Sequence, residues 1–126
     1  FGAIVLMASD QAFVAKEQCA IYGATKAAIA QLAKSTALDY ATYGIRVNCV
    51  CPGTIDTPMY QAVISQFQQK TGLAASLIRE QVAKKLPLQR VGKPEEVAEL
   101  VGFLCSEASS FMTGALINID GGYTIQ

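Results

Sequence analysis

The chain has 126 residues, about the length of one domain, and its 52% of hydrophobic residues can form a sizeable core. Ten basic residues balance ten acidic ones, and the sequence has no basic run, no secretion signal and no apolar stretch of the roughly 18–20 residues that a membrane span needs. We therefore expect neither nucleic acid nor a membrane as a partner.

The first half of the chain has the pattern of a strand, a helix and a second strand. A continuous apolar run at residues 3–8 predicts a strand buried on both faces, and a loop of mixed composition follows it. Residues 20–43 predict a long helix that no proline interrupts. Residues 45–51 predict the next strand, which ends at Pro52-Gly53. This order is typical of a βαβ unit with parallel strands.

The middle of the chain, residues 54–92, is less regular. Two short helices are expected at residues 59–70 and 75–86, separated by Gly72. Their amphipathic character is only moderate. We therefore interpret about residues 57–88 as a lid-like helical insertion rather than as core.

The C-terminal part predicts one more helix and a last strand. Pro94 followed by two glutamates favours a helix start, and this helix runs to about residue 107. Residues 115–119 predict the last strand, which Asp120-Gly121-Gly122 closes. No repeat or linker divides the chain, so we expect residues 1–126 to belong to a single domain.

The four cysteines do not show the spacing of a metal site. Cys49 and Cys51 form one C-x-C pair on a strand-like run, without a second pair. A Cys/His site is excluded because the sequence contains no histidine. We expect no metal and interpret the cysteines as buried small hydrophobic residues of a reducing compartment, which indicates a cytoplasmic location: Cys19, Cys49, Cys51 and Cys105.

The predicted elements form an open α/β sheet with helices on its faces. Ligands bind such sheets outside the carboxyl ends of the strands. Ser9 follows the first strand, and Pro52-Gly53-Thr54 follows the second. Tyr22 and Lys26, at the start of the connecting helix, are expected near the same edge. Asp10 and Gln11, next to Ser9, either line a substrate pocket or belong to a solvated loop.

Tyr22 and Lys26 have a spacing that suits proton transfer. Residues four apart lie on one helix face, about 6 Å apart along the axis. An ammonium at that distance favours the phenolate form of a tyrosine, which can then exchange a proton with a carbonyl or alcohol oxygen. Ser9 could hold the same oxygen by a hydrogen bond. The spacing also occurs by chance, and Ser9 could simply end a strand or cap a turn, so these residues alone leave both interpretations open.

Further motifs surround this pair in a fixed order. Ser9 lies 13 residues before Tyr22 in Y-G-A-T-K, and G-I-R-V-N, P-G-T-I-D-T-P and a terminal D-G-G follow. Together these motifs resemble the C-terminal half of the short-chain dehydrogenase/reductase family, over essentially the whole chain. The resemblance implies the C-terminal part of a Rossmann-like, doubly wound parallel sheet.

The resemblance also implies a catalytic role for three residues. Tyr22 would be the general acid/base toward the substrate oxygen. Lys26 would favour the Tyr22 phenolate and bind the nicotinamide ribose. Ser9 would position and polarise the substrate oxygen.

Four more residues would contact the cofactor, NAD or NADP, according to the resemblance. Pro52 and Gly53 would let the backbone pass close to the nicotinamide. The backbone of Ile55 and the hydroxyl of Thr57 would bind the carboxamide or the neighbouring phosphate. From the residues alone, Pro52-Gly53 could also be an ordinary turn, and Thr57 a helix cap.

Several features of the family are not found in this chain. The Gly-rich dinucleotide turn, the residue that selects NAD or NADP and the additional active-site asparagine are absent. The chain also begins in a strand-like run without an initiator methionine. We therefore expect that an N-terminal dinucleotide-binding half is missing here rather than never encoded.

The leading hypothesis is an NAD(P)-dependent oxidoreductase that interconverts a secondary alcohol and a ketone, with a small molecule as substrate. The resemblance further implies a homo-oligomer, a tetramer or dimer, with the last strand and D-G-G at a subunit interface. One alternative is an epimerase or dehydratase of the same superfamily that retains its cofactor. Another is a non-catalytic scaffold fragment. A Ser-His-Asp hydrolase is excluded, because the chain has no histidine.

Overall fold

A computed structural model of the chain describes residues 2–126 and has a parallel sheet at its centre. The three strands are β1 (Gly2–Met7), β2 (Ile45–Pro52) and β3 (Leu116–Ile119), in the spatial order β1-β2-β3. Both pairs of neighbours run parallel. The predicted α/β class and the three predicted strands are confirmed, with boundaries shifted by a single residue.

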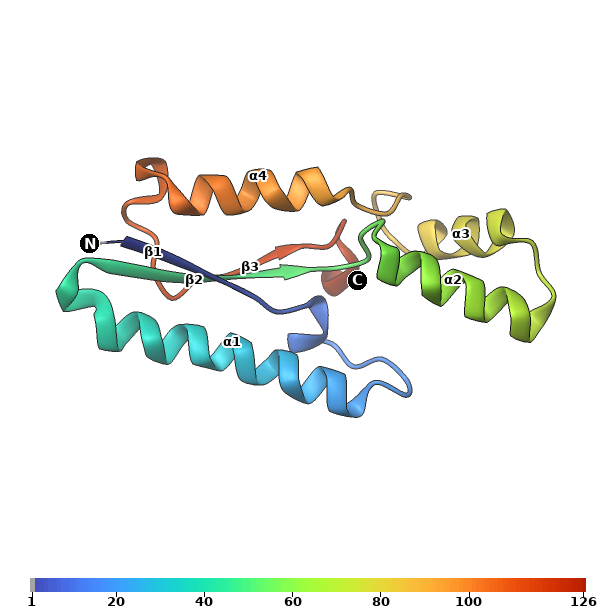
Figure 1. Cartoon of the computed structure of the whole chain (residues 1–126), viewed down its shortest axis with the longest axis horizontal. Helices are drawn as coiled ribbons and strands as arrows, with labels where there is room; N and C mark the ends of the chain where they lie inside the picture. The colour runs from blue at the N-terminus through green and yellow to red at the C-terminus, as the bar shows by residue number, and fades with distance from the viewer. Residues whose placement is uncertain (1) are drawn as a thin grey trace.

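Helices cover both faces of this sheet. Helix α1 (Ala20–Tyr40) joins β1 to β2 along one face, and helix α4 (Pro94–Cys105) lies along the other face (Figure 1). The helix is expected to end at residue 43, but α1 ends at Tyr40, because residues Ala41–Tyr43 form a 3₁₀ turn. Gly44 follows this turn in the left-handed region, at φ 69°, and lets the chain reverse into β2.

The core lies between α1 and β2. Small side chains on the helix, Ala33 and Ala37, contact Val47, Cys49 and Cys51 on the strand, and all five are buried. Residues 47–51 are buried at consecutive positions because β2 is the central strand and is covered on both faces. The small alanines allow the helix backbone to lie close to the sheet.

The prediction that the first strand is buried on both faces is wrong for the described chain. Ile4 and Met7 are exposed by 42% and 43%. The physical reason is the position of β1 at the edge of the sheet, where β2 is its one neighbouring strand among residues 2–126.

The cysteines fit their prediction in part. Cys49 and Cys51 are fully buried with their Sγ atoms 4.0 Å apart, and all four cysteines have free thiols. Burial raises the pKa of both buried thiols, that of Cys51 to about 12, so both stay protonated at neutral pH. The expectation of burial is wrong for Cys105, which is exposed on the last turn of α4.

Helices α2 (Pro58–Thr71) and α3 (Ala75–Lys84) form a pair beyond the carboxyl edge of the sheet (Figure 1). Tyr60 and Ile64 on α2 pack against Ile78 on α3, and this cluster is separate from the core of the sheet. Gly72, at φ 71°, ends α2 in the left-handed region. The two predicted helices and their separation at Gly72 are therefore confirmed, while their action as a lid stays a prediction.

No helix among residues 2–126 combines the length and the apolar character needed to cross a membrane.

Asn48 fastens the start of β3 to the central strand. Its amide nitrogen donates to the Met112 carbonyl at 2.8 Å, and its Oδ1 accepts from the Ala115 N–H at 3.1 Å. The side chain is 1% exposed, so these bonds replace water for two backbone groups. Asn48 therefore has a structural role in the described fold.

Replacing Asn48 by alanine should therefore destabilise the fold. The loss of two hydrogen bonds in a buried site is expected to lower the free energy of unfolding by about 2 kcal/mol or more. Urea titration followed by circular dichroism measures this change. Gln31→Ala, which removes an exposed amide from α1, serves as the control and should change the free energy by about 0.5 kcal/mol or less. Equal effects of the two variants would contradict this structural role.

Candidate functional site

Tyr22 and Lys26 lie on the first turns of α1, at the carboxyl end of β1. The Lys26 Nζ lies 5.5 Å from the centroid of the Tyr22 ring and donates a hydrogen bond to the Met7 carbonyl at 3.3 Å. Tyr22 is 40% exposed. The helix thus places both side chains together, and the contact with Met7 ties Lys26 to the end of the strand.

Ser9 is the second residue after the end of β1, and it caps a short 3₁₀ turn at Asp10–Ala12. Its Oγ accepts a hydrogen bond from the Gln11 N–H at 3.2 Å and donates one to the Asp10 Oδ1 at 2.9 Å. The hydroxyl is therefore fixed on two sides. The capping role weighed in the sequence analysis is present, and it leaves Ser9 at the edge where ligands bind such sheets.

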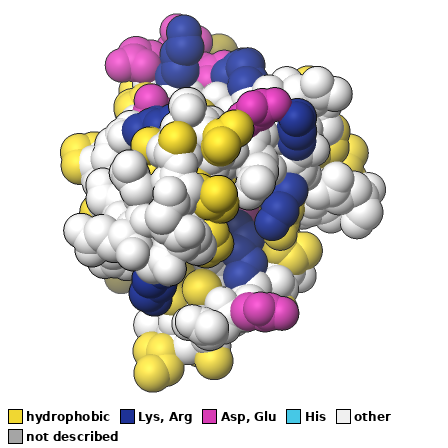
Figure 2. Space-filling view, turned by 90° about the vertical axis from the view of Figure 1, so that its right-hand side faces the viewer, with side chains coloured by type: hydrophobic (Ala, Val, Ile, Leu, Met, Phe, Trp, Pro, Cys, Tyr) yellow, Lys and Arg dark blue, Asp and Glu magenta, His cyan; other side chains and the backbone are white. Residues whose placement is uncertain are grey.

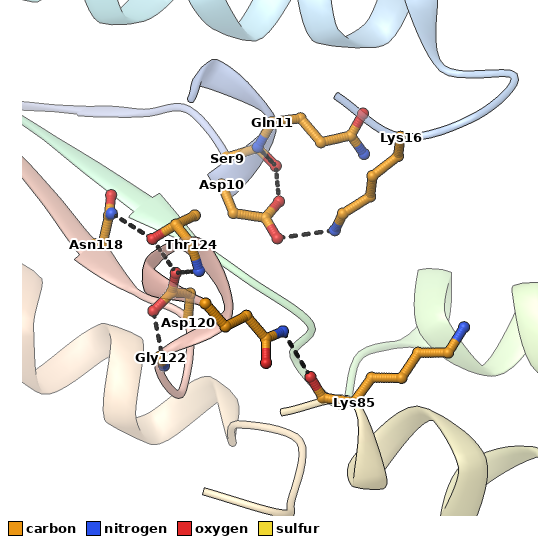
Figure 3. A network of polar contacts seen from close by, with 10 residues as sticks. Ser9, Asp10, Gln11, Lys16, Lys85, Asn118, Asp120, Gly122 and Thr124 are labelled. Carbon is orange, nitrogen blue, oxygen red and sulfur yellow. Dashed lines mark hydrogen bonds and ion pairs between the residues drawn. The ribbon is translucent and has the colours of Figure 1, made fainter. Parts of the chain in front are cut away.

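Asp10 is buried, and its second carboxylate oxygen forms an ion pair with Lys16. The Oδ2–Nζ distance is 2.7 Å (Figure 3). The Lys16 ammonium also lies 4.7 Å from the centroid of the Tyr123 ring. The sequence analysis left Asp10 between a pocket wall and a solvated loop, and the solvated alternative is wrong. No local pattern links Asp10 to Lys16, because both lie in an irregular segment.

Pro52 and Gly53 end β2 beside the end of β3. A Cβ atom on Gly53 would lie 2.8 Å from both the Cα and the Cβ of Asp120, which is too close for any side chain. The Gly53 N–H donates to the Ile119 carbonyl at 3.0 Å. This close approach is a structural reason for the glycine, independent of the cofactor contact that the resemblance implies.

Ile55 presents free backbone groups next to the end of the sheet. Gly92 bonds to the residues on either side of it, accepting from the Asp56 N–H at 2.9 Å and donating to the Thr54 carbonyl at 3.0 Å. Within residues 2–126, the N–H and carbonyl of Ile55 itself have no hydrogen-bond partner. One donor and one acceptor side by side match the two functions of a carboxamide.

Thr57 caps helix α2, as the sequence analysis allowed. Its Oγ1 accepts from the Tyr60 N–H at 3.3 Å. The cap uses a lone pair of the oxygen, so the hydroxyl proton stays available as a donor. Thr57 can therefore cap the helix and still donate to a ligand.

The predicted site residues gather along one edge of the sheet. Because β1 and β2 are parallel and Met7 is paired with Val50, Ser9 and Pro52 leave the sheet side by side. Ile55 and Thr57 continue from β2 into α2. At this end of the molecule, basic, acidic and hydrophobic side chains are interspersed (Figure 2).

A pocket of about 300 Å³ lies between the loop after Ser9 and the start of α1. Its wall includes Gln11, Lys16 and Gly23. The Oε1 of Gln11 is buried without a hydrogen-bond partner. Residues 2–126 contain no cluster of three or more metal-ligating side chains.

Asp120 uses its carboxylate within the chain. Oδ1 accepts from the Gly122 N–H at 3.0 Å, and Oδ2 accepts from the N–H and hydroxyl of Thr124 at 2.9 and 2.6 Å. Burial raises the pKa of Asp120, but these hydrogen bonds together outweigh burial and lower the pKa below its usual value. They also fix the 3₁₀ turn at Tyr123–Ile125. The placement of D-G-G at a subunit interface stays a prediction.

Comparison with known proteins places these motifs in a family. A family model described as enoyl-(acyl carrier protein) reductase matches residues 1–124. A cis-4-hydroxycyclohexanecarboxylate dehydrogenase of Sinomonas cyclohexanicum is 43% identical over 123 residues, which cover 98% of this chain and 45% of that protein.

Solved structures agree with this match. A short chain dehydrogenase family protein from Francisella tularensis is 51% identical with a TM-score of 0.96, over 98% of this chain and 51% of that one. L-sorbose reductase from Gluconobacter frateurii, complexed with NADPH and L-sorbose, is 33% identical with a TM-score of 0.93, over 99% of this chain and 48% of that one.

The chain thus spans about half the length of the proteins that it matches. The family model covers nearly all of it, and the structural agreement extends over the sheet, both layers of helices and the α2–α3 pair. On these grounds the chain belongs to the short-chain dehydrogenase/reductase family.

Proposed function

We propose that this chain is the catalytic part of an NAD(P)-dependent oxidoreductase that interconverts a secondary alcohol and a ketone. The observation that carries the proposal is the grouping of Tyr22, Lys26 and Ser9 at the carboxyl edge of the sheet. Membership of a family that includes dehydrogenases and reductases supports it. Further support comes from the NADPH in the complex of the related L-sorbose reductase.

Tyr22 would hold and move the proton of the reaction. Its exposed phenol can reach a substrate oxygen, and the ammonium of Lys26 beside the ring stabilises a phenolate. Ser9 would hold the same oxygen from the end of β1. When bound, NAD(P) supplies the hydride-transfer chemistry.

The residues after β2 fit a nicotinamide. The unpaired N–H and carbonyl of Ile55 match the carbonyl and amino group of a carboxamide. Thr57 adds a hydroxyl proton that its helix cap does not use. Lys26 would bind the ribose, and Pro52 and Gly53 would let the backbone pass close to the nicotinamide.

The substrate would be a small polar hydroxy or keto compound. The names of the similar proteins include a hydroxycyclohexanecarboxylate and L-sorbose, both of which carry hydroxyl groups. The pocket beside α1 offers the unpartnered Oε1 of Gln11, which can accept a hydrogen bond from such a hydroxyl. Helices α2 and α3 would act as the lid over this substrate.

The assembly would be a homo-oligomer, a tetramer or dimer, in the cytoplasm. Large hydrophobic side chains on the outer surface of α1 support an interface between subunits, namely Ile21 and Leu38, which are 82% and 80% exposed. The four free thiols fit a reducing compartment.

Tyr22→Phe tests the proposed acid/base directly. The variant keeps the ring but lacks the proton-bearing oxygen, so kcat should fall by about 10²–10⁴-fold. The measurement is oxidation of small secondary alcohols, followed through the absorbance of the reduced nicotinamide, in the protein that contains this chain.

Tyr40→Phe is the matched control, because Tyr40 is an exposed tyrosine at the other end of α1. This variant should keep the parent activity. Turnover of Tyr22→Phe within a few-fold of the parent would sink the proposal. Turnover without net change in the reduced nicotinamide would favour the cofactor-retaining epimerase or dehydratase.

Thr57 allows the cofactor contact to be separated from the helix cap. Thr57→Val removes both and should weaken NAD(P)H binding by about fivefold, the equivalent of one hydrogen bond of about 1 kcal/mol. Thr57→Asp keeps a capping oxygen but has no donor proton at neutral pH, so it should also bind weakly. Thr57→Ser keeps both functions and should bind like the parent. Titration of nicotinamide fluorescence gives the dissociation constants, and an unchanged value in Thr57→Val would contradict the contact.

A further inference from the structure

We propose that Asp10 positions Ser9 for its contact with the substrate oxygen, and that Lys16 and Tyr123 hold Asp10 in place. This makes Asp10 a positioning residue of the reaction, although it does not touch the substrate. The inference rests on the proposed function, because it requires Ser9 to contact the reacting oxygen.

The hydrogen bonds of Ser9 leave little freedom to its side chain. A serine side chain has three staggered rotamers, and each places Oγ at a different point. In this chain Oγ lies 2.9 Å from the Asp10 Oδ1 and 3.2 Å from the Gln11 nitrogen. Asp10 accepts the hydrogen bond that the Ser9 hydroxyl donates, and the Gln11 N–H donates to a lone pair of Oγ. Two partners on different sides therefore select one rotamer.

Asp10 is itself held on both of its oxygens. Its side chain is 3% exposed, and a buried carboxylate needs a nearby positive charge or several hydrogen bonds. Lys16 provides the charge, with its Nζ at 2.7 Å from Oδ2. Because Oδ2 is bound to Lys16, Oδ1 is turned toward Ser9. The ion pair with Lys16 thus holds in place the Asp10 oxygen that accepts the hydrogen bond from Ser9.

Lys16 is itself held by the 3₁₀ turn at Tyr123–Ile125. The Lys16 ammonium lies 4.7 Å from the centroid of the Tyr123 ring, within the range of a cation–π contact. Tyr123 opens a 3₁₀ turn. Asp120 fixes this turn through its hydrogen bonds to Gly122 and Thr124 (Figure 3). A chain of contacts therefore runs from Ser9 through Asp10 and Lys16 to the turn after β3.

This arrangement has a defined effect on the reaction. Contact with a ketone oxygen requires the Ser9 O–H to rotate away from Oδ1, while Oγ itself stays in place. Without Asp10, Oγ would be shared among several rotamers, and only one of these faces the substrate oxygen. Because the Ser9 contact strengthens as negative charge develops on that oxygen, the loss should appear in kcat rather than in KM.

A double-mutant cycle of Ser9→Ala and Asp10→Ala tests the inference in the protein that contains this chain. Asp10→Ala removes the oxygen that accepts the hydrogen bond from Ser9, and kcat should fall about tenfold while KM changes less than about twofold. In the Ser9→Ala background the same change should alter kcat by less than about twofold, since nothing remains to be positioned.

Further variants separate positioning from a merely structural role. Lys16→Met should lower kcat in the same direction as Asp10→Ala, again only when Ser9 is present. Tyr123→Phe keeps the ring and should retain the parent kcat, whereas Tyr123→Leu should lower it. Melting temperatures of all variants report the contact itself, independently of turnover, and the losses from Ser9→Ala and Asp10→Ala should be less than additive.

Two outcomes are distinguishable from failure of the proposed function. If Tyr22→Phe abolishes turnover but the kcat losses of Ser9→Ala and Asp10→Ala multiply, the positioning role of Asp10 is overturned alone. If Asp10→Ala raises KM and leaves kcat unchanged, the same conclusion holds. If turnover survives Tyr22→Phe, the proposed function falls and the inference falls with it.

Discussion

The parallel pairing of β1 with β2 is the constraint on which the rest of the site depends. Pairing of Met7 with Val50 brings the two strand ends to one edge, so Ser9 and Pro52 emerge next to each other. Helix α1 connects the end of β1 to the start of β2, and its first turns therefore lie at this same edge. A slip of the register by a single residue would exchange the residues on the two faces of β2 and move every one of these positions.

Several site residues carry a structural task in addition to their proposed role. Ser9 caps the turn after β1, Thr57 caps α2, and Gly53 makes room for Asp120. The two tasks are compatible, because a capping hydroxyl accepts through a lone pair and keeps its proton for another acceptor. The structural task also restricts the side chain to one position before any ligand binds, which reduces the entropy lost when the ligand does.

A buried carboxylate beside the proposed catalytic serine is costly unless something neutralises it. Lys16 does so for Asp10, and Tyr123 adds a cation–π contact to the lysine. The C-terminal turn thereby becomes part of the site, although it is remote in sequence. Asp120 fixes this turn by a hydrogen bond to Thr124. The Gln126 amide nitrogen donates to the Lys85 carbonyl at 2.9 Å, which links the turn to the end of α3.

Local patterns in the sequence are enough to predict the helices and strands and the spacing of Tyr22 and Lys26. Hydrophobic runs, together with glycine and proline at their ends, predict strands and helices from local physics alone, and helix geometry places Tyr22 and Lys26 on one face. The motif set likewise pointed to the correct family. Tertiary structure alone decided the exposure of Ile4 and Met7, the steric need for Gly53 and the partners of Asp10. These features arise where segments distant in sequence meet, and no periodicity along the chain records which side chains will be neighbours there.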